Sequence, residues 1–250
     1  MKGRLRLIDT LRGITIVSMI AFHACWDMMW FNLGVTEKFL YSRPAYIWQQ
    51  SICWSFILIS GFCFSYGHKN VIRGLYVLGG GILITAITLF VIPDAADIFG
   101  VLFLLGSSIL LTVPIDRALS GKDKLYPVLF VVSLILFFVT RNVNIGTFGF
   151  EGLSFGHFPE SLYHGYFMTY LGFKDPGFVS SDYFSLIPWF FLFETGYFAN
   201  KMLKGKEKNI PAFYKGIRPF ELPGRHSFII YMLHQVVLYG VFYLISLVAG

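Results

Sequence analysis

The residues of this chain best suited to chemistry are histidines and carboxylates that lie inside apolar stretches. In the segment 4–27, RLRLIDTLRGITIVSMIAFHACWD, a helical repeat of about 100° per residue brings several ionisable side chains to one face. The members of this polar stripe are Asp9, Arg12, His23 and Asp27. A histidine with a carboxylate one turn away can move a proton as a general base. It can also serve only as a hydrogen-bonding contact between helices.

A second histidine stands near the other end of the chain, in GRHSFIIYMLHQ, where His234 is followed by Gln235. At a rise of about 1.5 Å per residue, His23 lies roughly 16 Å beyond Arg12, about half the hydrocarbon thickness of a bilayer. The same rise places His234 roughly 13 Å from Arg225. The two histidines are therefore expected at similar depth, although interhelical hydrogen bonding remains the alternative for each.

The composition defines the elements that must position these side chains. Of the 250 residues, 56% are hydrophobic and only 14% are charged, which is typical of an integral membrane protein. We expect an all-α, polytopic helix bundle forming a single domain over 1–250, with the opening helix retained because no small-residue cleavage site follows it. The seven predicted spans are 8–31, 45–66, 71–92, 97–115, 125–140, 183–203 and 226–249.

The distribution of basic residues predicts the orientation. Sixteen of the 20 Lys and Arg residues fall in the N-terminal arm and in the second, fourth and sixth connections. This bias predicts a cytoplasmic N-terminus and an outside C-terminus, in a multi-pass protein of the cytoplasmic (inner) cell membrane. The basic connection 201–225 suits anionic lipid headgroups or an anionic soluble ligand. Because the basic residues are interleaved with apolar spans, nucleic acid is not an expected partner.

Several other residues could contribute to a site, each with a simpler structural explanation. Ser60 could be a nucleophile, but with Gly61 it is more typical of close helix packing. Asp182 could be a second acid or base, or a solvated helix cap. Asp94 and Asp97, beside a proline, are predicted to form a solvated turn. No Cys and His cluster has the spacing of metal ligands, so no metal site is expected.

Five segments, taken in order, carry a resemblance to a known family. They are RLRLIDTLRGITIVSMIAFH, FILISGFCFSYG, DIFGVLFLLG, SSDYFSLIPWFFLFETGYF and GRHSFIIYMLHQ. Together they resemble the bacterial branch of the heparan-α-glucosaminide N-acetyltransferase-like membrane proteins, which is similar in turn to acyltransferase family 3. The resemblance implies transfer of an acetyl or other acyl group from cytoplasmic acyl-CoA to a sugar or glycan amine or hydroxyl outside.

The resemblance also implies roles for particular residues. His23 matches the catalytic histidine of acyltransferase family 3, Arg12 its motif arginine, and Ser60 the start of its Ser-Gly-Phe element. On this basis His23 is the expected base or acyl acceptor, supported by Asp27 or His234.

The substrates can then be assigned to either side of the membrane. The residues expected to bind the acetyl-CoA donor are Arg12, Arg73, Ser60 and Asp9. Asp182 and Gln235 are expected on the acceptor side, membrane lipids are expected partners, and a homodimer is compatible with this arrangement.

Two other functions remain open at this point. One is a transporter or flippase for a sugar or lipid-linked substrate, in which His23, Asp27 and His234 relay protons. The other is a non-catalytic scaffold with the same fold. Binding of acetyl-CoA separates the acyltransferase from both.

Overall fold

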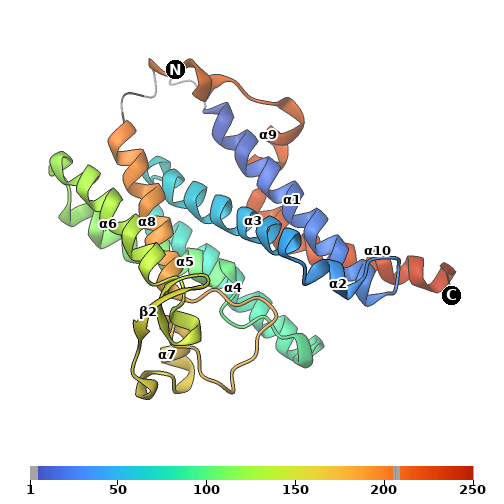
Figure 1. The fold of residues 1–250 in the computed structure, drawn as a ribbon. Helices are drawn as coiled ribbons and strands as arrows, with labels where there is room; N and C mark the ends of the chain where they lie inside the picture. The colour runs from blue at the N-terminus through green and yellow to red at the C-terminus, as the bar shows by residue number, and fades with distance from the viewer. Residues whose placement is uncertain (1–4, 205, 207–208, 250) are drawn as a thin grey trace. The chain divides into compact units, whose positions relative to one another are not determined.

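The fold is all-α apart from one small hairpin, as a computed structural model shows for residues 5–204, 206 and 209–249 (Figure 1). Lys2, Arg4 and Lys208, which contribute to the charge bias, lie outside the described residues. The α-helices are α1 (Arg6–Trp30), α2 (Glu37–Leu40), α3 (Arg43–Phe62), α4 (Asn70–Val91), α5 (Val101–Ala118), α6 (Tyr126–Val139), α7 (Gly165–Leu171), α8 (Leu186–Leu203), α9 (Arg218–Arg225) and α10 (Ser227–Ala249).

The predicted class, a polytopic membrane bundle, is confirmed. Six of the seven expected ranges coincide with helices that are long and apolar enough to cross a membrane, counted over the described residues. The seventh range, 183–203, corresponds to α8, which is not among the six. Glu194, Asn200 and Lys201 interrupt its apolar sequence, and the first two are buried. Its polar side chains therefore face protein, although its length is that of a span.

The chain divides into two compact units. Unit 1 comprises Met1–Phe56 and Gly205–Gly250, and contains α1, α2, most of α3, α9 and α10. Unit 2 comprises Ile57–Lys204 and contains the end of α3 and the elements from α4 to α8. The single functional domain expected over 1–250 stays a prediction.

Unit 1 is built on close contact between α1 and α9, which lie side by side in Figure 1. A Cβ atom on Gly13 would lie 1.8 Å from the Phe220 carbonyl oxygen, so only glycine permits this approach. Arg6 donates to Glu221 over 3.0 and 2.7 Å, and this cation lowers the pKa of Glu221. Ile217 N–H also donates to Thr10 Oγ1 at 3.0 Å. The basic connection is thereby attached to the first helix.

Unit 2 has its own core, in which α8 packs against α5, α6 and the end of α3. The α3 and α8 backbones meet at two glycines. A Cβ atom on Gly61 would lie 1.9 Å from the Phe193 carbonyl oxygen, and one on Gly196 would lie 2.1 Å from that of Leu58. Such close backbone approach is typical of helix packing in membranes.

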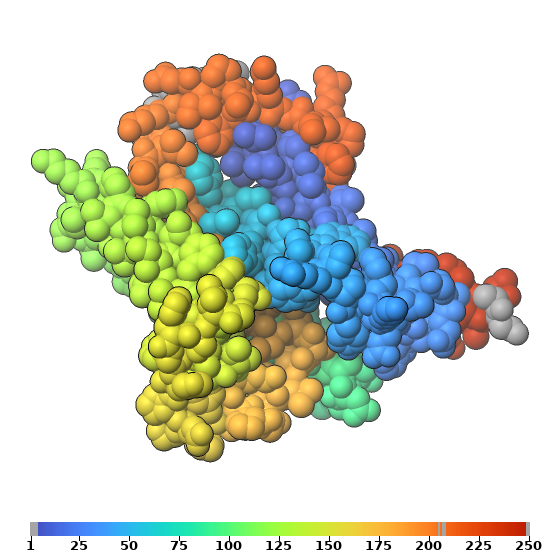
Figure 2. Space-filling view, in the orientation of Figure 1, coloured from blue at the N-terminus to red at the C-terminus, as the bar shows by residue number. Residues whose placement is uncertain are grey.

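The connection between α6 and α8 is ordered, and it contains strands that the sequence analysis did not predict. Strands β1 (Thr147–Phe150) and β2 (Leu153–His157) form an antiparallel hairpin. Asn142 Nδ2 fastens its turn by donating to the carbonyl oxygens of Glu151 and Leu153, at 2.9 and 3.1 Å. The hairpin and the α7 segment form one continuous surface, coloured yellow to light orange in Figure 2. In α7, Tyr170 hydrogen-bonds Ser107 of α5.

Candidate functional site

The predicted catalytic histidines lie together in unit 1. His23 of α1 and His234 of α10 have ring centroids 4.8 Å apart, with an angle of 67° between the ring planes. They are separated by more than 200 residues in sequence, and packing of α1 against α10 brings them into contact. His234 is 9% exposed, and His23 is partly buried.

The tautomer of His234 follows from its backbone contact. Its Nδ1 lies 2.6 Å from the carbonyl oxygen of Tyr231. Because a carbonyl oxygen can only accept, Nδ1 must carry the hydrogen, and in the neutral ring Nε2 then bears the lone pair. Nε2 is buried and has no hydrogen-bond partner among the described residues. The neutral His234 therefore presents an unsatisfied proton acceptor inside unit 1.

Asp27 is engaged by Gln235 and not by His23. The Gln235 amide Nε2 donates to Asp27 Oδ1 at 2.9 Å, while Asp27 Oδ2 is buried without a partner among the described residues. Asp27 is 6% exposed. Of the two residues expected to support His23, His234 is therefore the one in contact with it, and Asp27 lies one turn further along α1.

Aromatic side chains enclose this cluster. Phe22 packs edge-on against both His23 and Trp48, with centroid distances of 6.5 and 5.2 Å. The Trp48 indole N–H donates to Ser18 Oγ at 2.8 Å, which holds α3 against α1. Tyr231 lies 5.3 Å from the ring of His234. The two histidines and the hydrogen-bonded pair of Asp27 and Gln235 are thus polar groups in an otherwise apolar interior.

Asp9 and Arg12, which share one face near the start of α1, have different environments. Asp9 is buried and lies 3.5 Å from Arg225 Nε of α9. Arg12 is partly buried and makes no hydrogen bond or ion pair with another described residue. Arg225, which the sequence analysis used only as a depth marker, thus supplies the counter-ion of Asp9. The guanidinium of Arg12 remains available for an anion.

Arg73, the other predicted donor-binding cation, belongs to unit 2. Its Nη1 lies 3.5 Å from Asn70 Oδ1 at the beginning of α4. Asn70 lines an open cavity of about 460 Å³, together with the cationic side chains of Lys69 and Arg117. Neither Lys69 nor Arg117 was predicted as a binding residue, although both come from connections predicted to be cytoplasmic.

Ser60 is buried at the contact between α3 and α8. Its neighbour Gly61 meets the α8 backbone at Phe193. The Ser-Gly-Phe element therefore has a clear packing role in unit 2, as the simpler of the two interpretations expects.

Asp97 departs from prediction. It was expected in a solvated turn with Asp94, and only Asp94 is exposed. Burial, and secondly the charge of Asp182, raise the pKa of Asp97 to about 8. Asp182 itself lies 3.4 Å from the Val101 backbone N–H through Oδ2, at the start of α5. The predicted solvation of Asp97 is wrong because folding places the two carboxylates together.

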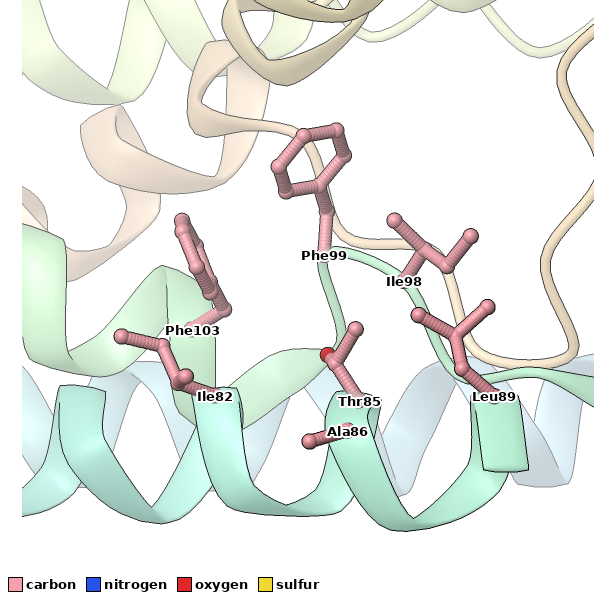
Figure 3. A pocket seen from close by; sticks show the side chains of 7 residues that line it. All are labelled: Ile82, Thr85, Ala86, Leu89, Ile98, Phe99 and Phe103. Carbon is pink, nitrogen blue, oxygen red and sulfur yellow. The ribbon is translucent and has the colours of Figure 1, made fainter. Parts of the chain in front are cut away.

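The residues that follow Asp97 in sequence form an apolar groove with α4. It has a volume of about 250 Å³ and is lined by α4 and by the start of α5. Figure 3 shows the rings of Phe99 and Phe103 on one side and Ile82 and Thr85 of α4 below them. With a threonine hydroxyl as its only polar side-chain group, this groove suits a hydrocarbon chain and offers no catalytic group.

Glu194 of α8, which is 3% exposed, was not predicted from the sequence as a site residue. It lies next to Thr112 of α5 in the core of unit 2. A single acid within an apolar stretch, in FFLFETGYF, is the signal that could have found it.

The predicted site residues are divided between the two units. Unit 1 contains His23, Asp27, His234, Gln235, Asp9 and Arg12, and unit 2 contains Ser60, Arg73 and Asp182.

These features define a class of protein, a polytopic membrane protein with a buried histidine pair and cationic sites near helix ends. The chain belongs to the family of the heparan-alpha-glucosaminide N-acetyltransferase catalytic domain, whose family model matches residues 4–236. The resemblance drawn from the five segments is thereby confirmed, and membership indicates activity of the membrane acetyltransferase type. Neither the curated proteins nor the solved structures include a significant match.

Proposed function

We propose that this protein is a membrane-bound acyltransferase that moves an acetyl group from acyl-CoA to a sugar or glycan amine or hydroxyl. The observation that carries the proposal is the contact between His23 and His234, in a chain that belongs to an acetyltransferase family. The unpartnered Nε2 of His234 adds a proton acceptor to this contact. The interior is otherwise lined by aromatic rings, which exclude water from a reactive intermediate.

In the proposed reaction, His23 acts on the acetyl group or on the acceptor. As a general base, it takes the proton from the acceptor while the acceptor's nitrogen or oxygen attacks the thioester carbon. The C–S bond then breaks, and the CoA thiolate receives the proton. As a nucleophile, a ring nitrogen of His23 attacks the thioester carbon, and the C–S bond breaks with CoA leaving as the thiol or thiolate. The acceptor's nitrogen or oxygen then attacks the acetyl-histidine, the C–N bond to the ring breaks, and the released imidazole takes up the acceptor's proton. In either route, His234 orients the ring of His23, and Asp27 with Gln235 stabilises the adjoining turns of α1 and α10.

The donor requires cations for its phosphates. Arg12 is suited to this role because no described residue neutralises it, and Asp9 with Arg225 supports the same end of α1. Arg73 and the cavity beside Lys69 offer a second cationic surface, on unit 2. Ser60 is buried beside the Gly61 contact with α8, so we propose it only as a neighbour of this second cationic surface.

The acceptor and the cellular setting complete the proposal. The charge bias supports a cytoplasmic N-terminus, donor binding at the cytoplasmic side, and an acceptor outside the cell membrane. Asp182 and Gln235 remain the proposed acceptor-side residues, and a homodimer in the lipid bilayer is compatible with this arrangement. Tagging each terminus with a reporter that is active on one side only would test the orientation.

The decisive experiment is binding of acetyl-CoA to the purified protein by calorimetry. We expect saturable binding that weakens on Arg12→Ala, with Lys38→Ala as the matched control because Lys38 is exposed and lies on the opposite predicted side. Release of CoA with amino sugars and with hydroxyl-only sugars then identifies the acceptor class. A folded protein that binds no acetyl-CoA would refute the acyltransferase and favour a transporter or scaffold.

A further inference from the structure

Glu194 is a buried acid that the proposed reaction does not use. It lies in the middle of α8, between α5 and α6, and is 3% exposed. No cation pairs with it among the described residues, and its Oε2 has no hydrogen-bond partner there. An isolated carboxylate is very costly in such a place, whereas a neutral carboxylic acid is not. Burial without a counter-ion therefore favours the protonated form.

The hydrogen bonds of Thr112 lead to the same conclusion by a separate route. Its Oγ1 lies 2.7 Å from the Ser108 carbonyl oxygen and 2.5 Å from Glu194 Oε1. A threonine hydroxyl has one hydrogen, and a backbone carbonyl can only accept. Both contacts become full hydrogen bonds when Glu194 carries a proton and donates it to Thr112, which donates in turn to Ser108. An ionised Glu194 would have to share that single hydrogen with the carbonyl.

One turn further along both helices lies a second acid, which reaches water. Asp116 follows Thr112 by four residues on α5, and Tyr197 follows Glu194 by three on α8, so each pair shares a helix face. The Tyr197 hydroxyl donates to Asp116 Oδ1 at 2.7 Å, and Lys201 forms an ion pair with Asp116. The Asp116 side chain is 36% exposed and lines the cavity beside Lys69.

From these contacts we infer that Glu194 is a proton-binding site in the interior of unit 2, which exchanges its proton with water through Asp116. In the exchange the O–H bond of Glu194 breaks and an O–H bond forms on Asp116, which then releases the proton into the cavity. The return follows the same path. Nothing in this inference depends on acyl transfer, and failure of the proposed reaction would leave it standing.

Among the described residues, Asp116 of α5 and Tyr197 of α8 interact electrostatically with Glu194. Lys201 and Lys204, at the end of α8, interact with Asp116. The cavity that Asp116 lines also carries His68, Lys69 and Arg117. On α6, the ring of Tyr126 lies 5.8 Å from the Lys201 ammonium. Lys201 forms an ion pair with Asp116. The charge of that pair is therefore unchanged after the exchange only if the proton from Glu194 passes through Asp116 and does not remain on it.

Infrared spectroscopy of the purified full chain tests the inference without an activity assay. The C=O stretching band of a protonated carboxylic acid is followed in the parent and in Glu194→Gln, an isosteric variant that can still donate to Thr112. Their difference isolates Glu194 from other protonated acids, Asp97 among them. We expect the band in the parent at neutral pH and its loss in the variant. If the C=O band of protonated carboxylic acid is the same in the parent and in Glu194→Gln, Glu194 is ionised and the inference is overturned.

The route is tested by transferring the protein into D₂O and timing the isotope shift of that band. We expect exchange to slow by about 10²-fold in Asp116→Asn, the lower end of what a positioned proton-transfer group contributes. The exposed Asp94→Asn is the control and should exchange as the parent does. If Asp116→Asn alone does not fold, the double variant Asp116→Asn with Lys201→Gln removes the carboxylate without leaving the Lys201 ammonium unpaired. Exchange at the parent's rate in a folded variant that lacks the Asp116 carboxylate would refute the route through Asp116.

Discussion

Replacing His23 by alanine separates a catalytic histidine from a packing one. The ring of His23 contacts His234 and Phe22, and it makes no hydrogen bond with a described residue. Its removal therefore leaves no polar partner unsatisfied. The energetic cost to the fold should come from lost ring contacts alone, at about 0.5–1.5 kcal/mol for each aromatic pair.

The expected cost to catalysis is larger. A positioned general base contributes ~10²–10⁴-fold to turnover, which corresponds to about 3–5 kcal/mol in the activation barrier at about 1.36 kcal/mol per tenfold change. His23→Ala should thus lose most of its turnover while its melting temperature and its affinity for acetyl-CoA remain close to those of the parent. His234→Ala should also lose turnover, because His23 loses the ring against which it is oriented.

The assay is release of CoA from acetyl-CoA in the presence of an accepted sugar, measured on protein of verified folding. His226→Ala is the matched control, since His226 is exposed and belongs to the same unit. Mass spectrometry after incubation with acetyl-CoA alone detects an acetyl-histidine if transfer proceeds in two steps. Turnover of His23→Ala within a few-fold of the parent would refute the assignment and direct attention to His234.

Two further predictions concern unit 2. Gly61→Ala places a Cβ atom 1.9 Å from the Phe193 carbonyl oxygen, so the free energy of unfolding should fall by ~1–3 kcal/mol or more. Gly79→Ala is the control and should be tolerated, because its Cβ atom would have no atom within 4 Å. Equal melting temperatures for the two variants would contradict the close packing. Asp97, whose pKa is raised from 3.8 to about 8, holds its proton in the folded state over a pH range in which the unfolded chain has lost it. Stability should therefore decrease as the pH rises from about 4 to about 8, and Asp97→Asn should flatten this slope in thermal melts. A slope that is unchanged in Asp97→Asn would show that another group is responsible.

The sequence alone was sufficient for those features that depend on local composition. Apolar runs long enough for a bilayer located the seven long helices to within a few residues, because the requirement for about 20 apolar residues acts on each segment independently. The short helices α2, α7 and α9 were not predicted. The helical repeat placed His23 and Asp27 on one face of α1, since that property belongs to a single helix. Five ordered motifs were enough to indicate the family.

Tertiary structure decided the pairings, because they join residues that are far apart in the chain. No local pattern shows that His234 meets His23 while Gln235 binds Asp27, since both contacts depend on how α10 packs on α1. Asp97 looked like part of a solvated turn until folding set it beside Asp182, more than 80 residues later, where burial and a like charge favour its protonated form. The chemistry of each ionisable group in this protein is set by its neighbours in space, and those neighbours are supplied by helix packing.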